Sequence, residues 1–592
     1  MKDQITVSLL LKRYKTWVKR GDIRFLGEDS RKEVVDCIDE LMRIMAPAQK
    51  NSKDFKWHEA HKNGIILWHK LASNALRNIQ STSKGNSTLF NFLTAATEFE
   101  DLLYGLEPYY RDHTLHSLWV YLIGEYILRY QLKKDQLGEI HGDLNWYLIN
   151  DIRKDGDRYS YPPILVKYSE YKEKVLIKGI DGVLKNRDAI WCIVALCHDL
   201  GYSLAKLTAL NDKVKAVLNF FELSNLKPVG YSLDIEHQYL ISQFLELMAM
   251  DVRIVPGDNY EELKNLEIPK EDEGLEQLET PEFIKKLEEL EKEQPAKEFI
   301  KKLEEKTLIK CYRDDSTYWR LCRALEQKRH GILSAYLIYK ILGIFSEASV
   351  RGPAEEWGLD DDEAIENIIR GDILFAIAQH EFDFAYLFDF SSLADILILA
   401  DELEEFSRFG RPLQSREYYP TMADSKINFE KAGKDEKDIV IRIIYEVAEH
   451  CNLIDFFLKK AERLCRIYSL NEEGEENVSY RRIVEISMTV TKKMKRCSLG
   501  IELNRDPSKA KVHLPEFKTS DDTSKNGKND FNFTLYDDRI CIRDNGEPMS
   551  LIEWFKKFEK DEVRRRVKTG WIKEEIEKWI ELPNELKELM YL

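Results

Sequence analysis

Ala189-Ile-Trp-Cys-Ile-Val-Ala-Leu-Cys197 is an unbroken apolar run, and His198-Asp199 follows it directly. Such a run predicts a buried helix. Two adjacent ionisable side chains are costly in these surroundings unless something neutralises them. A bound cation would do so, because imidazole nitrogen and carboxylate oxygen are both good ligands for divalent metals. The stretch therefore predicts a buried helix that carries metal ligands.

Further candidate ligands lie beside or within other apolar stretches that predict helices. These are His116, His330, His380 and Asp401. Together with His198-Asp199 they give the order His…His-Asp…His…His…Asp. A single histidine on an apolar helix is usually a satisfied core residue, and Asp401 could simply end a buried helix, with Glu402, Glu404 and Glu405 facing solvent. The adjacent His-Asp pair favours a shared metal site over these separate readings.

Composition bounds the class of protein. The chain has 592 residues, of which 43% are hydrophobic and 33% charged, an ordinary balance for a globular protein. Its formal net charge of −16 argues against broad nucleic-acid binding but does not exclude small phosphorylated substrates. The nine cysteines form no C-x-x-C pair, and no apolar run approaches the roughly 20 residues that span a bilayer. We expect a cytoplasmic protein that does not enter a membrane.

Periodicity along the chain predicts a mainly α fold. We expect a helical N-terminal region over 1–89, an all-helical core over 90–410, and a small α+β domain over 430–592. Within 256–306 the composition is dominated by Glu, Lys and Leu, and Phe-Ile-Lys-Lys-Leu-Glu-Glu occurs twice. This segment predicts an exposed helical or partly disordered insertion. A homo-oligomer or a protein partner is expected to use the insertion or the C-terminal domain.

The end of the chain changes character. We predict a polar loop over 410–435, a long helix over about 437–468 and a strand over 486–491. Phe531 to Arg543 predicts a hairpin that turns at Asp537-Asp538.

A second histidine group, His58, His61 and His69, lies in the N-terminal region. No carboxylate or fourth ligand follows at a metal-binding spacing. We therefore predict an ordinary helix surface there.

The motifs around the candidate ligands resemble those of the HD-domain metal-dependent phosphohydrolases. They are His116-Ser-Leu-Trp-Val, Cys197-His-Asp-Leu-Gly201, Arg329-His-Gly-Ile-Leu-Ser-Ala and Ala400-Asp-Glu-Leu-Glu-Glu-Phe-Ser-Arg408. The resemblance covers about 90–410. It implies that His116, His198, Asp199 and Asp401 are the shared metal ligands, and that His330 and His380 complete a two-metal centre.

The resemblance also implies a mechanism. Two cations about 4 Å apart can hold and activate a water that attacks phosphorus. Asp199 would bridge the ions and His330 would act as ligand or catalytic residue. Histidine-rich ligands favour Mn, Fe or Zn over Mg. His113, three residues before His116, is a candidate proton donor to the leaving group.

Substrate contacts are expected from basic residues near the ligands, namely Arg329, Arg408 and Lys206. One cyclic dinucleotide phosphodiesterase subfamily has a catalytic lysine after its His-Asp-x-Gly motif. Here that position is Tyr202, and Lys206 is the nearest lysine.

The predicted activity is hydrolysis of a phosphoester or phosphoanhydride in a nucleotide, as a cyclic nucleotide or dinucleotide phosphodiesterase or a nucleotide phosphatase. A deoxynucleoside triphosphate triphosphohydrolase is the alternative. It is favoured by the resemblance of Arg111…His116-Ser-Leu-x-Val and of His330-x-x-x-Ser334 to that branch of the family, and disfavoured by His380. An alternative of another class is a non-catalytic sensor or scaffold that only binds ligand.

Overall fold

The fold is that of a computed structural model of the whole chain. The residues that it describes are mainly 5–46, 56–78, 112–131, 187–219, 235–256, 307–341, 361–381, 393–406, 423–432, 438–448, 482–492 and 495–502, with short pieces between and beyond them. Arg408 and most of the insertion predicted at 256–306 lie outside the described residues. The predicted mainly α fold with a smaller α+β region is confirmed.

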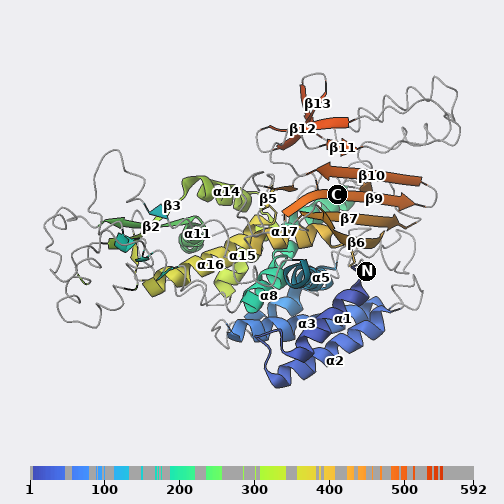
Figure 1. Cartoon of the computed structure of the whole chain (residues 1–592), viewed down its shortest axis with the longest axis horizontal. Helices are drawn as coiled ribbons and strands as arrows, with labels where there is room; N and C mark the ends of the chain where they lie inside the picture. The colour runs from blue at the N-terminus through green and yellow to red at the C-terminus, as the bar shows by residue number, and fades with distance from the viewer. Residues whose placement is uncertain are drawn as a thin grey trace.

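Three helices are buried on every side and form the centre of the helical part: α5 (His113–Tyr126), α8 (Arg187–Cys197) and α17 (Leu393–Leu403). A helix that is apolar all round has no solvent face to present, so it occupies the interior. Helix α8 contacts α3, α5, α16 and α17. Helix α8, which contains the apolar run 189–197, thus lies at the core of the fold (Figure 1).

Other helices surround this centre. On one side lie α1 (Val7–Arg20), α2 (Glu28–Met45) and α3 (Trp57–Asn78). The others are α9 (Tyr202–Ala205), α10 (Leu207–Asn219), α11 (Ile235–Met248), α14 (Asp315–Glu326), α15 (His330–Ile341) and α16 (Asp361–Gln379). Helix α5 continues as a π-helical turn, η2 (Ile127–Gln131).

One stretch of the described residues, Arg187–Asp212, is long and apolar enough to cross a membrane. Of its most apolar window, 61% is buried inside the protein, as in the core helix of a soluble protein. The stretch is also interrupted by the turn at 198–201. Packing in the core therefore accounts for its apolar character.

The prediction that 90–410 is all-helical is wrong, because residues 250–256 and 307–313 pair as antiparallel strands of a four-stranded sheet. Its order is β1 (Ile149–Asn150), β2 (Met250–Pro256), β3 (Thr307–Arg313) and β4 (Trp357–Leu359). Pro256 pairs with Thr307 across antiparallel strands β2 and β3. The described residues on either side of 257–306 therefore lie next to one another.

The C-terminal region builds an eight-stranded sheet in the order β14-β13-β12-β11-β10-β9-β7-β6. Its strands are β6 (Ala423–Ala432), β7 (Asp438–Val447), β9 (Arg482–Lys492), β10 (Lys495–Glu502), β11 (Lys511–His513), β12 (Asp530–Tyr536), β13 (Arg539–Asp544) and β14 (Glu547–Ser550). Two short strands, β5 (Tyr386–Phe388) and β8 (Ile467–Ser469), pair separately in parallel.

Two predictions for this region are confirmed. The expected strand at 486–491 lies within β9. Strands β12 and β13 form the expected hairpin, since Tyr536 pairs with Arg539 across a connection at Asp537-Asp538.

Two others are wrong. The predicted loop at 410–435 contains β6, and the first part of the predicted helix at 437–468 is β7. In β7, buried Ile441, Ile443 and Tyr445 alternate with exposed Arg442 and Ile444. This alternation, together with the β-branched residues, specifies a strand with one face buried in the core and the other exposed.

The prediction of a plain helix surface is wrong for His61. Its side chain is buried, and Nδ1 lies 2.7 Å from Asp112 Oδ2. Asp112 is the N-cap of α5, accepting a hydrogen bond from Leu115 N at 3.0 Å. The pair therefore ties α3 to the start of α5.

Replacing Asp112 by asparagine is expected to lower the free energy of unfolding by about 1–3 kcal/mol at neutral pH. Burial raises the pKa of Asp112, but His61 and the hydrogen bonds outweigh it and hold the pKa below its ordinary value. The carboxylate therefore stabilises the fold above its unfolded pKa of about 4, and this contribution is lost as the pH falls through the lower folded value. Urea unfolding of both proteins at a series of pH values should show the difference shrinking in that window. A difference that stays constant would contradict this assignment.

Candidate metal centre

Helix ends and helix faces from across the core bring the predicted ligands to one place. His116 lies at the end of the first turn of α5, and His330 begins α15. His198 and Asp199 follow α8, His380 follows α16, and Asp401 lies near the end of α17. The structure places His198-Asp199 in a turn directly after the helix rather than inside it. This turn frees both side chains to face the same point.

Asp199 is the centre of the cluster, and its two carboxylate oxygens face different histidines. Oδ2 lies 3.4 Å from His116 Nε2 and 3.5 Å from His198 Nε2. Oδ1 lies 3.0 Å from His330 Nε2 and 3.6 Å from His380 Nε2. The carboxylate therefore divides the cluster into two halves.

We call His116, His198 and Asp401 the first half-site, and His330 and His380 the second half-site. In the first, His116 Nε2 lies 2.9 Å from Asp401 Oδ1 and 3.3 Å from His198 Nε2. In the second, the two Nε2 atoms lie 3.0 Å apart. All the predicted ligands are thus brought together, each half-site facing one oxygen of Asp199.

Backbone carbonyls fix the tautomers of two of these histidines. Nδ1 of His198 lies 2.8 Å from the carbonyl oxygen of Ala195, and Nδ1 of His380 lies 2.6 Å from that of Ile377. A carbonyl oxygen can only accept a hydrogen bond, so each Nδ1 donates one. In the neutral rings, Nε2 is then an acceptor that points into the cluster.

Glutamates do the same for the other two. Nδ1 of His116 lies 2.6 Å from Glu404 Oε2, and Nδ1 of His330 lies 2.8 Å from Glu381 Oε1. Glu381 also accepts a hydrogen bond from the Gly331 N–H at 3.1 Å. Metal-binding histidines are commonly oriented by a carboxylate or a carbonyl in this way.

The neutral cluster therefore consists of acceptors that face acceptors. Nitrogen lone pairs and carboxylate oxygens at about 3 Å repel one another unless positive charge lies between them. Ligand atoms of His116, His198 and Asp401 lie within 4.8 Å of one another, as do those of His198, Asp199 and His380. This buried group of histidines and aspartates could hold a metal ion.

The electrostatics of the two half-sites differ. Burial lowers the pKa of His198 to about 3, so this ring is a neutral ligand. Burial also lowers the pKa of His330, but Glu381 and Asp199 outweigh it and raise the pKa to about 10. Burial raises the pKa of Asp199, yet His198 and His330 hold it well below its ordinary value. The carboxylates around the second half-site thus favour positive charge.

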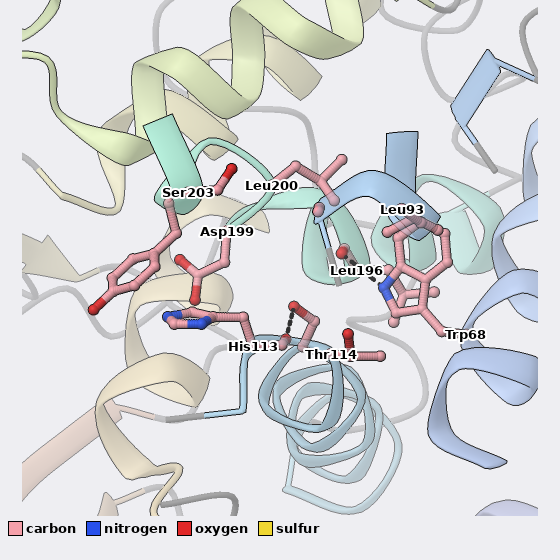
Figure 2. A pocket seen from close by; sticks show the side chains of 11 residues that line it. Trp68, Leu93, His113, Thr114, Leu196, Asp199, Leu200 and Ser203 are labelled. Atoms are coloured by element: carbon pink, nitrogen blue, oxygen red, sulfur yellow. Dashed lines mark hydrogen bonds between the residues drawn. The ribbon is translucent and has the colours of Figure 1, made fainter. Parts of the chain in front are cut away.

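A pocket opens beside Asp199. Its polar lining includes His113, Thr114 and Ser203, and its apolar lining includes Trp68 and Leu200. In Figure 2 the Asp199 carboxylate and the His113 ring lie on one side of this pocket, and Trp68 and Leu93 lie on the other.

His113 stacks on the ring of Tyr202, with their centroids 3.6 Å apart. Lys206 Nζ lies 4.9 Å from the centroid of the Tyr202 ring. Arg329 Nε donates to Gln327 Oε1 at 3.1 Å. Arg408 falls outside the described residues. The role of Arg329, Arg408 and Lys206 toward a substrate stays a prediction.

Sequence reasoning did not identify the groups that orient the ligands. Glu381 directly follows His380, and Glu404 lies three residues after Asp401. Instead of facing solvent, Glu404 and Glu405 are buried. A carboxylate next to a ligand within an apolar stretch is the signal that could have indicated Glu404 and Glu381.

The comparisons give no relative: no protein-family model, curated protein or solved structure matches the chain.

Replacing Glu404 or Glu381 by glutamine is expected to weaken cation binding by about 10- to 100-fold. Each change removes the charge that orients one histidine while preserving the shape of the side chain. Glu404→Gln should act on the first half-site and Glu381→Gln on the second. Isothermal titration with Mn²⁺ measures both; equal loss of every bound ion in each variant would contradict a centre with two half-sites.

Proposed function

We propose that this protein is a metal-dependent phosphohydrolase of the HD type that acts on a nucleotide. The observation that supports it most is the Asp199 carboxylate, which turns one oxygen to each half-site. A bridging carboxylate between histidine groups is the arrangement that a two-cation hydrolytic centre needs. The order His…His-Asp…His…His…Asp along the chain agrees with this proposal, and so does the grouping of these histidines and aspartates in space.

The residues favour particular cations. Four imidazole nitrogens and two carboxylates form a nitrogen-rich ligand set. Mn, Fe or Zn suits such a set better than Mg, which prefers oxygen. A pair of these cations would supply an activated water and offset the charge of the phosphoryl oxygens.

The side chains then have distinct parts in hydrolysis. Asp199 keeps the half-sites together, while Glu404 and Glu381 hold His116 and His330 in the ligating tautomer. His113, outside the cluster but on the same pocket as Asp199, is placed to donate a proton to the leaving-group oxygen. Its stacking on Tyr202 fixes the ring at the edge of the pocket.

A substrate panel tests the proposal. The chain, loaded with Mn²⁺ or Fe²⁺, would be incubated with nucleoside triphosphates, cyclic nucleotides and cyclic dinucleotides, beside a His198→Ala/Asp199→Ala variant. We expect hydrolysis by the wild type that the variant loses.

The products separate the remaining alternatives. Release of inorganic triphosphate from deoxynucleotides would identify a triphosphohydrolase. If the protein binds a nucleotide but hydrolyses none of the panel, the result would contradict the proposed enzymatic activity and favour a non-catalytic sensor.

A further inference from the structure

The last turn of α17 ends in buried glutamates. Glu402, Glu404 and Glu405 are 8%, 0% and 1% exposed. The turn continues past Leu403, because Glu404 N donates to the Ala400 carbonyl oxygen at 3.1 Å. This turn carries the ligand Asp401 and also Glu404, which orients His116. Its position therefore sets the geometry of the first half-site.

A buried lysine from the C-terminal region holds this turn. Lys460 is 4% exposed, and its Nζ lies 2.5 Å from Glu405 Oε1. Nζ also donates to the Glu402 carbonyl oxygen at 3.2 Å and lies 5.8 Å from the ring centroid of Tyr445 in β7. Carbonyls at the end of a helix have no partner within the helix, and a cation stabilises that end.

We infer that Lys460 is a positioning residue for the candidate metal centre, acting on Asp401 and Glu404 through the end of α17. The inference rests on the proposed function. A residue some 60 positions after Asp401 would thus make the C-terminal region part of the hydrolytic site rather than an appendage. Figure 1 shows α17 beside the C-terminal sheet, consistent with the contacts of Lys460.

The effect of Lys460 should be confined to one half-site. His330 and His380 are carried by α15 and α16, and His330 is oriented by Glu381. The contacts of Lys460 with Glu405, with the Glu402 carbonyl oxygen and with the Tyr445 ring lie at the end of α17 and in β7. Loss of Lys460 should therefore disturb the first half-site and spare the second.

The test compares two double variants. Lys460→Met/Glu405→Gln removes the buried pair without leaving one charge alone in the core. The matched control, Arg129→Met/Glu125→Gln, removes a buried pair with a 2.5 Å contact between α5 and η2. Mn²⁺ binding would be followed by the EPR signal of the free ion, and exchange of the Glu404 amide by hydrogen–deuterium exchange.

We expect Lys460→Met/Glu405→Gln to weaken one Mn²⁺ by about 10-fold or more, to leave the other within about twofold, and to speed exchange at Glu404. The control should lower thermal stability with both ions retained. Equal weakening of both ions, or unchanged affinity and unchanged exchange, would overturn the inference. If the wild type takes up no Mn²⁺, the proposed function fails, and exchange at Glu404 alone decides whether Lys460 positions the turn.

Discussion

Asp199→Asn is expected to abolish cation binding at both half-sites, and hydrolysis with it. The asparagine keeps the shape of the side chain but removes the charge and one of the two oxygens that face the histidines. Losing an orienting partner costs about 10- to 100-fold in affinity, and loss of the shared ligand should exceed this for each ion. Elemental analysis after dialysis against Mn²⁺ and phosphate release from the active substrate measure the two effects.

The matched control is Asp188→Asn, at another buried aspartate, in the first turn of α8. Asp188 pairs with Arg187 and Arg129, and these charges outweigh burial to hold its pKa below the ordinary value. Its replacement should lower stability while metal content and activity per folded molecule stay unchanged. Full metal content in Asp199→Asn would contradict the central place of Asp199.

Gly201→Ala is expected to separate α15 from the turn that carries Asp199. A Cβ at Gly201 would lie 2.5 Å from the His330 carbonyl oxygen and 2.6 Å from Ser334 N, and these backbone atoms cannot rotate away. The Ser334 hydroxyl links the turn to α15: its Oγ accepts a hydrogen bond from Gly201 N at 2.7 Å and donates one to the His330 carbonyl oxygen at 2.8 Å. The added methyl group should therefore move His330 away from Asp199.

The expected cost of Gly201→Ala is about 1–3 kcal/mol in the free energy of unfolding, as for overpacking in a core. Cation affinity at the second half-site should fall about 10-fold or more. Gly27→Ala is the matched control, because a Cβ there meets nothing within 4 Å. Urea unfolding and Mn²⁺ titration compare the two. Wild-type values in both measurements for Gly201→Ala would contradict the close approach of α15.

The ligand residues could be predicted because each is costly where it lies. A histidine or aspartate beside or within an apolar run, such as 189–197 or 393–403, needs a polar or charged partner. One shared metal site would supply that partner for all of these residues. The glutamates that orient the ligands were harder to predict from the sequence. Glu404 resembles an exposed acidic residue in one dimension, and only the fold shows that His116 lies against it.

The errors in the fold have similar causes. Ile439 to Val447 lies at the start of the range, about 437–468, that is predicted as one long helix. Its alternation of buried and exposed residues belongs to a strand, and its neighbours β6 and β9 supply the pairing. The position of Lys460 could not be predicted from the sequence, because it depends on contacts with α17, which lies far from Lys460 along the chain.

Anomalous X-ray scattering from crystals of the wild-type chain grown with Mn²⁺ tests the central claim most directly. The account predicts two peaks on either side of Asp199, one among His116, His198 and Asp401 and the other between His330 and His380. Crystals that bind Mn²⁺ elsewhere, or that show no peak within this cluster, would contradict it.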